Sequence, residues 1–260
     1  MKEWIEYHKL MGVEHFRLYN NDSTDNYRQI LDPYIESGDV TLVDWPTDLG
    51  RPGVRAGWVW FTQFPAFTDA IFYFTGVSKW LAIIDLDEFI VPLHQNDLPS
   101  FLEEYESEAG VLINWQNFGT SGISELPSDK LMIEVLTKKA KKKSSYNYPV
   151  KSIVRPERVN ITEKCWCPHT WDYVSGYGHI FPNHKKWRFG EIEVSKVRIN
   201  HYVHRSERYF HEVKVASKER MEGKKLKKKH IQNWKKSCNQ VEDTEILRFA
   251  PQLRERVFSE

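Results

Sequence analysis

Cysteine is scarce in this sequence, which excludes a disulfide framework. The chain holds three cysteines, Cys165, Cys167 and Cys238, and small proteins held together by disulfides need more. Cys165 and Cys167 are also too close along the chain to bridge easily. With His169 they form a Cys-x-Cys-x-His pattern, but structural zinc sites usually space their cysteines as in Cys-x-x-Cys. The pattern therefore favours free thiols over a zinc site.

Long apolar runs are missing as well. No stretch approaches the ~18 consecutive apolar residues that a membrane-spanning helix needs. Met1 is followed at once by a charged, helical pattern rather than by a signal peptide. We therefore expect no transmembrane segment in this chain. Its compartment would follow from its source, cytoplasmic in a bacterium and the Golgi lumen in a eukaryote.

Net charge of either sign is also nearly absent. Lys and Arg number 37 against 36 Asp and Glu, which leaves a formal charge of +1. This balance predicts no nucleic-acid partner, because bulk electrostatic binding needs an excess of positive charge. Two local basic runs occur, at residues 138–143 and 224–229. They are explained most simply as solvated surface, and the alternative is a phosphate-rich or peripheral membrane partner.

Helical and strand patterns alternate along the first half of the chain, which predicts an α/β fold. Apolar spacing favours helices over residues 2–11 and 62–74, and strands over 15–19, 40–43, 80–85 and 111–114. A further helix, with Ser23 or Thr24 as its cap, would carry Ile30, Leu31, Tyr34 and Ile35 before Gly38. Such alternation is typical of a mainly parallel sheet flanked by helices. We expect one catalytic domain over residues 1–204. A basic, helical C-terminal tail over residues 205–260 would pack on it or beside it.

Polar segments follow three of the predicted strands, at residues 20–25, 85–88 and 115–122. Ligands of open α/β sheets bind beyond the carboxyl ends of the strands. The second segment reads Asp85-Leu86-Asp87-Glu88. Residues two apart in an extended chain project to one side, and two adjacent carboxylates repel each other unless a cation lies nearby. Mg²⁺ or Mn²⁺ suits such oxygen ligands, and the alternative is a solvated loop.

Two classes of enzyme place an Asp-x-Asp motif after a buried strand. Haloacid-dehalogenase-like phosphatases use the first Asp as a nucleophile, but they have Thr or Val where this chain has Phe89. They also need a later acidic pair for magnesium, and the sequence contains no Asp-Asp. Nucleotide-sugar transferases use the carboxylates to hold a metal ion against a diphosphate. The motifs before Asp85 favour the transferase.

Several motifs together resemble glycosyltransferase family 92, in the order in which that family has them. They are Glu3-Trp4-Ile5-Glu6-Tyr7-His8, Gly12-Val13-Glu14-His15-Phe16, residues 19–25, residues 80–89, residues 115–122, and Asn200-His201-Tyr202 with Arg205-Ser206. The resemblance covers residues 3 to about 214. It implies a GT-A-type fold, a UDP-sugar donor, a divalent metal (Mn²⁺ or Mg²⁺), inversion at the anomeric carbon and a glycan acceptor. Characterised relatives are chiefly galactosyltransferases that use UDP-galactose.

The sequence departs from the family pattern in two places. Family members have a strand and an Asn-Glu segment ahead of the motif at residues 3–8, and this sequence starts after them. That strand helps to form the nucleotide pocket. The residue after Gly122 is commonly His in the family and is Ile123 here, which is consistent with a different acceptor.

The resemblance and the residue chemistry together indicate which residues would bind the nucleotide-sugar donor and the metal. Asp22 and Asp25 would accept hydrogen bonds from the uracil or ribose, the alternative being an Asx turn and helix cap. Asp87 would bind the metal directly, and Asp85 the ribose or a metal-bound water. His201 resembles the late histidine that completes the metal site of many GT-A enzymes.

Acceptor activation needs a general base, for which the candidates are Glu134, Asp172 and Glu125. We prefer Glu134 because it follows the proposed acceptor loop in a patterned segment. Trp115 and Phe118 would form a stacking platform for an acceptor sugar, and core packing is the alternative for both.

The sequence thus predicts a metal-dependent inverting transferase that moves a hexose, galactose being one candidate, from a UDP-sugar to a glycan. The metal would neutralise charge on the departing diphosphate, with Lys214 or Arg205 assisting. A non-catalytic module that binds glycans or nucleotides is the alternative, and a phosphohydrolase that uses Asp85 comes third.

Overall fold

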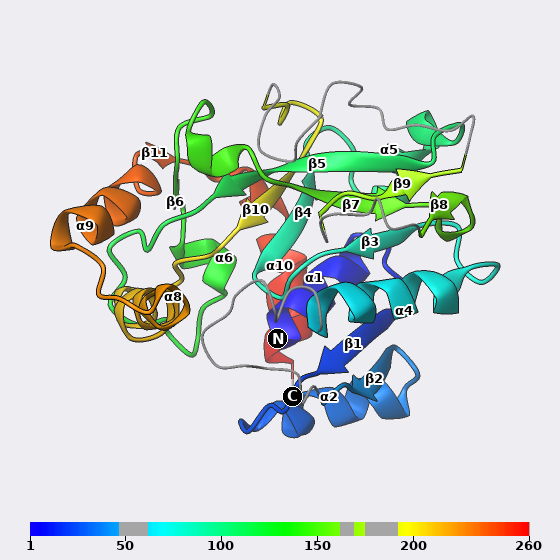
Figure 1. The fold of residues 1–260 in the computed structure, drawn as a ribbon, viewed down its shortest axis with the longest axis horizontal. Helices are drawn as coiled ribbons and strands as arrows, with labels where there is room; N and C mark the ends of the chain where they lie inside the picture. Colours follow the sequence, from blue (N-terminus) through cyan, green and yellow to red (C-terminus); the bar gives the residue numbers. More distant parts are fainter. Residues whose placement is uncertain (47–61, 162–168, 175–191, 260) are drawn as a thin grey trace. The chain divides into compact units, whose positions relative to one another are not determined.

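The computed structural model describes residues 1–46, 62–161, 169–174 and 192–259 (Figure 1). The chain divides into two compact units. The first comprises Met1–Ile83, Asp97–Leu112 and Ser152–Pro182, and the second Ile84–Asn96, Ile113–Lys151 and Asn183–Glu260. The Cys165 and Cys167 motif lies outside the described residues. The predicted domain boundary after residue 204 stays a prediction, and residues 205–259 belong to the second unit.

Helices and strands alternate along the first unit. Its elements are α1 (Lys2–Leu10), β1 (Phe16–Asn20), α2 (Tyr27–Glu36), β2 (Val40–Asp44), α4 (Phe64–Phe74), β3 (Leu81–Ile83), α5 (Leu98–Leu102), β8 (Val159–Asn160), β9 (Asp172–Tyr173) and the 3₁₀ turns Glu103–Tyr105 and Pro156–Arg158. Strands β1 and β2 pair in parallel, with Phe16 opposite Val40. The helices and strands predicted over the first 44 residues are confirmed.

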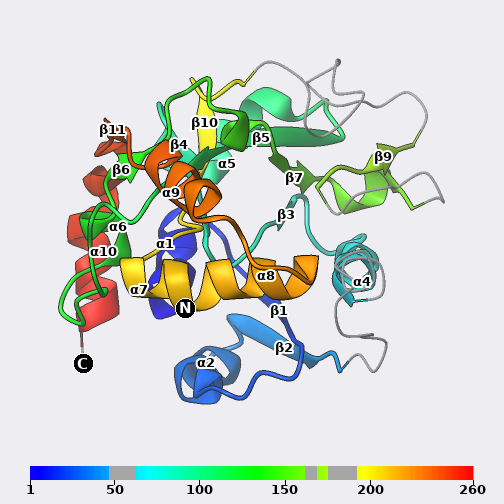
Figure 2. The same ribbon diagram turned by 60° about the vertical axis from the view of Figure 1, so that its left-hand side comes forward.

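The second unit contains the remaining elements. They are β4 (Glu88–Pro92), α6 (Met132–Val135), β6 (Lys138–Lys139), β10 (Val197–His201), α7 (Glu207–Tyr209), a π-helical turn (Phe210–Val215), α8 (Ala216–Glu222), α9 (Lys228–Ser237), β11 (Val241–Glu242), α10 (Ala250–Phe258) and the 3₁₀ turns Ser145–Asn147 and Glu245–Phe249. Strands β5 (Gly110–Asn117) and β7 (Val150–Val154) contribute residues to both units. Figure 2 shows α7 to α8 as one continuous helical run.

The main sheet is mixed, with strand order β3-β7-β5-β10-β4. Strand β10 runs parallel to β5 and antiparallel to β4, and β3 runs antiparallel to β7. Every residue of β4 and β10 is buried. This mixed α/β sheet with its helices is compatible with the GT-A-type fold that the family resemblance implies.

Two local predictions were wrong, each for a physical reason. The apolar strand expected over residues 80–85 spans only Leu81–Ile83, and of its side chains only Ile83 is buried. An edge strand such as β3 has a neighbour on one side only. Ser23 or Thr24 was expected to cap α2, but the helix begins after Asn26 and has no side-chain cap. The Ser23 N–H donates instead to Asn20 Oδ1 at 3.0 Å.

A buried histidine in α1 predicts that stability falls in mild acid. His8 is 1% exposed, and its Nδ1 lies 2.9 Å from the Trp4 carbonyl oxygen. Burial lowers the pKa of His8 to about 4, against the opposing effect of that hydrogen bond. An unfolded chain has His pKa near ~6.5, so it binds more protons than the folded chain below that pH. His8 should therefore cost about 1.4 kcal/mol of stability for each pH unit between pH 6.5 and 4.

The measurement is the free energy of unfolding in guanidinium at pH 7.0 and 5.5, for wild type and His8→Asn. Asn retains a donor for the Trp4 carbonyl but does not titrate. We expect the wild type to lose about 1 kcal/mol more than the variant across this interval. Equal losses in the two proteins would show that His8 does not cause the loss of stability in acid.

Candidate active site

The two aspartates of the Asp-x-Asp motif lie in the turn that leads into β4. This turn is closed by two hydrogen bonds, from the Glu88 N–H to the Asp85 carbonyl at 3.1 Å and from the Asp85 N–H to Glu88 Oε2 at 2.8 Å. The Asp87 side chain is 11% exposed and that of Asp85 is 37% exposed. The two carboxylates therefore have different surroundings.

Asp87 meets His201, which ends strand β10. His201 Nε2 lies 3.6 Å from Asp87 Oδ1. The backbone holds this arrangement, because β10 pairs with β4 at His201 and Glu88, and the Tyr202 N–H donates to the Asp87 carbonyl at 2.8 Å. The Trp115 ring, from β5, packs on the imidazole at 4.2 Å between centroids. The structure thus brings together three of the predicted site residues: Asp87, His201 and Trp115.

Positive groups surround the Asp87 carboxylate. Lys214 Nζ lies 3.0 Å from Asp87 Oδ2, and Arg205 adds charge from a left-handed backbone position (φ 49°). Burial alone would raise the pKa of Asp87, but His201, Lys214 and Arg205 outweigh burial and hold it well below its usual range. Asp87 is therefore ionised at neutral pH.

Asp85 has a different cation. Lys151 is 1% exposed within β7, and its Nζ lies 2.9 Å from Asp85 Oδ2 and 3.7 Å from Glu88 Oε2. Burial raises the pKa of Glu88 well above its usual range. Burial opposes the charge on Lys151, but Asp85 and Glu88 outweigh it and raise the pKa of Lys151. Each aspartate of the motif thus has a lysine of its own.

Asp87 and His201 fit a divalent ion as a two-residue site. Among the described residues, no group of three or more His, Cys, Asp and Glu side chains is arranged to hold a metal. Mg²⁺ commonly takes one or two carboxylates and completes its shell with water and substrate phosphates. Adjacent ligands of such an ion are about 3 Å apart, close to the observed 3.6 Å. His201 Nδ1 is buried without a hydrogen-bond partner, so the imidazole is not committed elsewhere.

The two aromatic candidates differ in burial. Trp115 is half-buried beside His201. Phe118 is fully buried and packs on Tyr202 at 4.9 Å between ring centroids. Sugar stacking stays a prediction for both, and the burial of Phe118 favours core packing for that residue.

Glu134, the preferred general base, accepts two hydrogen bonds from residues of the second unit. Its Oε2 accepts from the Leu131 N–H at 2.9 Å and from Arg254 Nη1 at 2.8 Å. The first bond caps α6 and the second ties α6 to α10. Of the other candidates, Glu125 pairs with Arg208 and Asp172 is half-buried in β9. The identity of the base stays a prediction.

Asp22 and Asp25 lie on the exposed loop that follows β1, in the first unit. Asp22 has a positive φ of 54°. The side chain that closes this turn belongs to Asn20, so neither aspartate is needed for the Asx turn offered as the alternative. Donor binding by these two residues stays a prediction.

Sequence reasoning missed Lys151 and the burial of Glu88. A signal for Lys151 was present, because it is a single charge within the apolar segment Val150-Lys151-Ser152-Ile153-Val154. A lysine is almost never fully buried unless it is paired. The segment therefore implied an acidic partner, although it did not say which one.

Comparison with known proteins identifies the family of this chain. The profile of glycosyltransferase family 92 matches residues 1–241. The chain belongs to glycosyltransferase family 92.

Curated relatives of this chain include plant proteins that are named for this family. A family 92 protein of Ricinus communis is 27% identical over 94% of this chain and 43% of its own length. One of Oryza sativa is 24% identical over 97% of this chain and 42% of its own length. A galactan beta-1,4-galactosyltransferase of Arabidopsis thaliana is 32% identical over 40% of this chain and 20% of its own length. The chain spans less than half the length of these relatives.

Within the described part of the chain, no helix is both long enough and apolar enough to cross a bilayer.

Proposed function

We propose that this chain transfers a hexose from a UDP-sugar to a glycan, with a divalent metal ion and with inversion at the anomeric carbon. Galactose is the first sugar to test, because relatives in Arabidopsis thaliana and Caenorhabditis elegans are named beta-1,4-galactosyltransferases. The observation that carries the proposal is the ionised Asp87 carboxylate 3.6 Å from the His201 imidazole. Family membership supports the same chemistry.

The residues around Asp87 have separable roles in this mechanism. Asp87 and His201 would hold the ion, which when bound supplies a Lewis acid for the departing diphosphate. Lys214 and Arg205 lie close enough to Asp87 to place further positive charge near the same diphosphate. Lys151 orients Asp85 through a 2.9 Å contact. The half-exposed carboxylate of Asp85 would accept a hydrogen bond from a ribose hydroxyl.

Inversion requires a single displacement at the anomeric carbon, and a base must take up the proton of the acceptor hydroxyl. The acceptor hydroxyl oxygen forms a bond to the anomeric carbon while the bond from that carbon to the diphosphate oxygen breaks. The hydroxyl proton passes to a carboxylate that acts as general base. Glu134 remains our candidate, and its test is a Glu134→Gln variant assayed beside Glu125→Gln.

The experiment is a calorimetric titration of UDP-sugars into the protein with Mn²⁺, repeated with a chelator. We expect binding that needs the metal and favours one sugar, followed by transfer to a glycan in a product assay. Sugar binding that survives both the chelator and Asp87→Ala would instead indicate a non-catalytic binding module. Phosphate release from a phosphomonoester without any sugar nucleotide would indicate a phosphohydrolase.

A further inference from the structure

The second unit holds an open cleft whose lining shares no residue with the Asp-x-Asp turn. Its volume is about 480 Å³, within the range of ~300–1,000 Å³ typical of small-ligand sites. The loop Thr120–Gly122 lines it together with Lys138, and α9 and the residues that follow contribute Lys235, Lys236 and Asn239. The side chains of these residues end in hydroxyl, amide and ammonium groups, and the surface between those groups is mainly carbon.

Hydrogen bonds fix the loop against the end of α9. The Ser121 N–H donates to Asn239 Oδ1 at 2.7 Å, and Asn239 Nδ2 donates to the Lys235 carbonyl at 2.8 Å. A β-carbon at Gly119 would lie 2.3 Å from Asn239 Nδ2, so the close approach depends on glycine. The Lys138 N–H also donates to Ser121 Oγ at 2.8 Å. These contacts shape the cleft without any ligand.

The charge of the cleft is positive and largely uncompensated. Glu207 is the one acidic residue among the described residues that line it, and it already pairs with Lys235 and accepts from Thr120. Burial opposes ionisation of Glu207, but these partners outweigh it and lower its pKa. Within the described ranges, no carboxylate forms an ion pair with Lys138 or Lys236.

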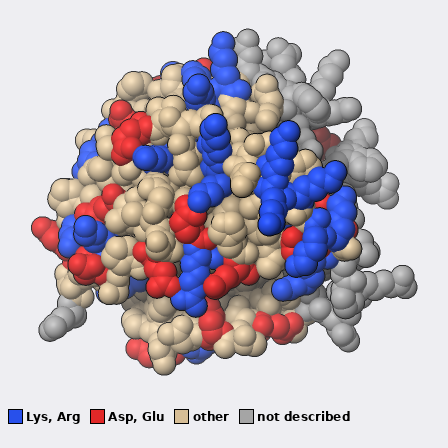
Figure 3. Space-filling model, turned by 90° about the vertical axis from the view of Figure 1, so that its left-hand side faces the viewer, with Lys and Arg blue, Asp and Glu red and all other residues tan. Residues whose placement is uncertain are grey.

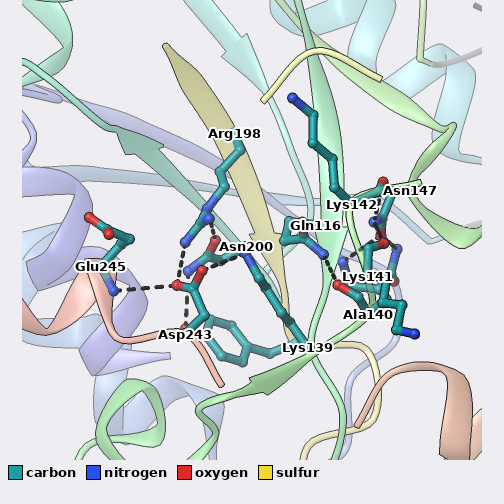
Figure 4. Close-up of polar contacts among 12 residues, drawn as sticks. Gln116, Lys139, Ala140, Lys141, Lys142, Asn147, Arg198, Asn200, Asp243 and Glu245 are labelled. Atoms are coloured by element: carbon teal, nitrogen blue, oxygen red, sulfur yellow. Dashed lines mark hydrogen bonds and ion pairs between the residues drawn. The ribbon is translucent and has the colours of Figure 1, made fainter. Parts of the chain in front are cut away.

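Further lysines belong to the two basic runs, at residues 141–143 and 227–229. Figure 3 draws the side of the molecule that lies at the left of Figure 1, and Lys and Arg side chains gather toward its upper and right-hand parts. The backbone of the first run is pinned, because Asn147 Nδ2 donates to the Lys141 and Lys142 carbonyls at 3.0 and 3.2 Å (Figure 4). Lys139 points inward to Asp243 and does not contribute.

We propose that the cleft binds an anionic group of the acceptor glycan, a carboxylate or a phosphate ester. This inference rests on the proposed function, because it names the acceptor of the same transferase. The cations of the cleft are lysines, point charges that take either anion. Its hydroxyl and amide groups suit the hydroxyls of adjoining sugars.

The cleft lies within reach of the proposed metal site along two paired strands. Asn117 of β5 stands opposite His201 of β10, and Thr120 follows Asn117 by three residues. Three residues span at most about 11 Å, and paired strands lie about 4.8 Å apart. Thr120 is therefore within about 16 Å of His201, a distance that an oligosaccharide of a few sugars covers.

A glycan fits this surface better than a bilayer does. Membrane-binding helices insert aromatic or aliphatic side chains from their exposed face. The aromatic residue of α9, Trp234, instead packs on Phe210 and His204, at 5.2 and 5.0 Å between ring centroids. The residues that α9 contributes to the cleft are instead Gln232, Lys235 and Lys236.

The test is calorimetric binding in chelator without UDP-sugar, so it does not depend on donor chemistry. The probes are trigalacturonic acid, its fully methyl-esterified form and pentamannosyl phosphate. We expect the first or the last to bind, with affinity that falls as salt rises, and the neutral ester to bind at least tenfold more weakly. Lys138→Gln/Lys236→Gln should lower affinity for the anionic probe about tenfold. The same variant should keep metal-dependent UDP-sugar binding.

The matched control is Lys130→Gln/Lys229→Gln, which removes the same charge outside the cleft, one lysine from a loop and one from α9. Equal loss of affinity in both double variants would show that the anion binds to a diffuse electrostatic surface, and it would reject binding in the cleft. Binding to vesicles with 30% anionic lipid but to none of the three oligosaccharides would overturn it in favour of a membrane. Failure of UDP-sugar binding in the wild type, with acidic glycan binding intact, would instead reject the proposed function alone.

Discussion

Asp87→Asn should reduce glycosyl transfer by about a thousandfold, because it removes the ionised carboxylate that lies beside His201. The substitution preserves side-chain volume and replaces a negative oxygen with a neutral amide. His201 and Lys214 would then face no opposite charge, and the affinity for Mn²⁺ should fall with the activity. The measurements are initial rates with UDP-galactose and an acceptor glycan, and calorimetric titration of Mn²⁺ in the presence of UDP.

The control for this substitution is Asp129→Asn, which removes an exposed carboxylate from a turn of the same unit. It should leave rate and metal affinity within about twofold of the wild type, since most surface changes have small effects. Thermal unfolding of all three proteins separates a loss of chemistry from a loss of fold. Full transfer by a folded Asp87→Asn protein would contradict the proposed role of Asp87 as a metal ligand.

Secondary structure was predictable where one periodicity ran for several turns or strands. Helix α1 and strands β1 and β2 follow directly from apolar spacing, and Gly12 ends α1 with a φ of 84°. The strand over residues 80–85 was predicted too long because an apolar run does not tell a central strand from an edge strand. Its neighbour β7 lies about 70 residues later in the chain, which local patterning cannot reveal.

The site was predictable only where a motif carried it. Asp87 and His201 were paired by their resemblance to a family pattern, and the structure places them 3.6 Å apart. Lys151 has no such motif, and its contact with Asp85 joins residues 66 positions apart. The cleft likewise depends on the contact of Ser121 with Asn239, across 118 positions. Composition showed the basic runs, but only the fold shows that Lys138 of the first run shares a cleft with Lys235 and Lys236.

Lys151→Met should destabilise the protein by about 3–5 kcal/mol, the cost of leaving buried charge without its partner. Lys151 is 1% exposed, and its Nζ is 2.9 Å from Asp85 Oδ2 and 3.7 Å from Glu88 Oε2. Met has similar volume, so the loss would arise from charge rather than from a cavity. The free energy of unfolding in guanidinium measures it.

A double variant tells which carboxylate depends on Lys151. Glu88 is fully buried whereas the Asp85 side chain is 37% exposed, so water can solvate Asp85 after the lysine is lost. Lys151→Met/Glu88→Gln should therefore recover at least about 1 kcal/mol of the loss. Lys79→Met is the surface control, because its ion pair with Glu106 is more than half exposed and should contribute less than about 1 kcal/mol. If Lys151→Met cost no more than Lys79→Met, the turn that carries Asp85 and Asp87 would not need a buried cation to hold its shape.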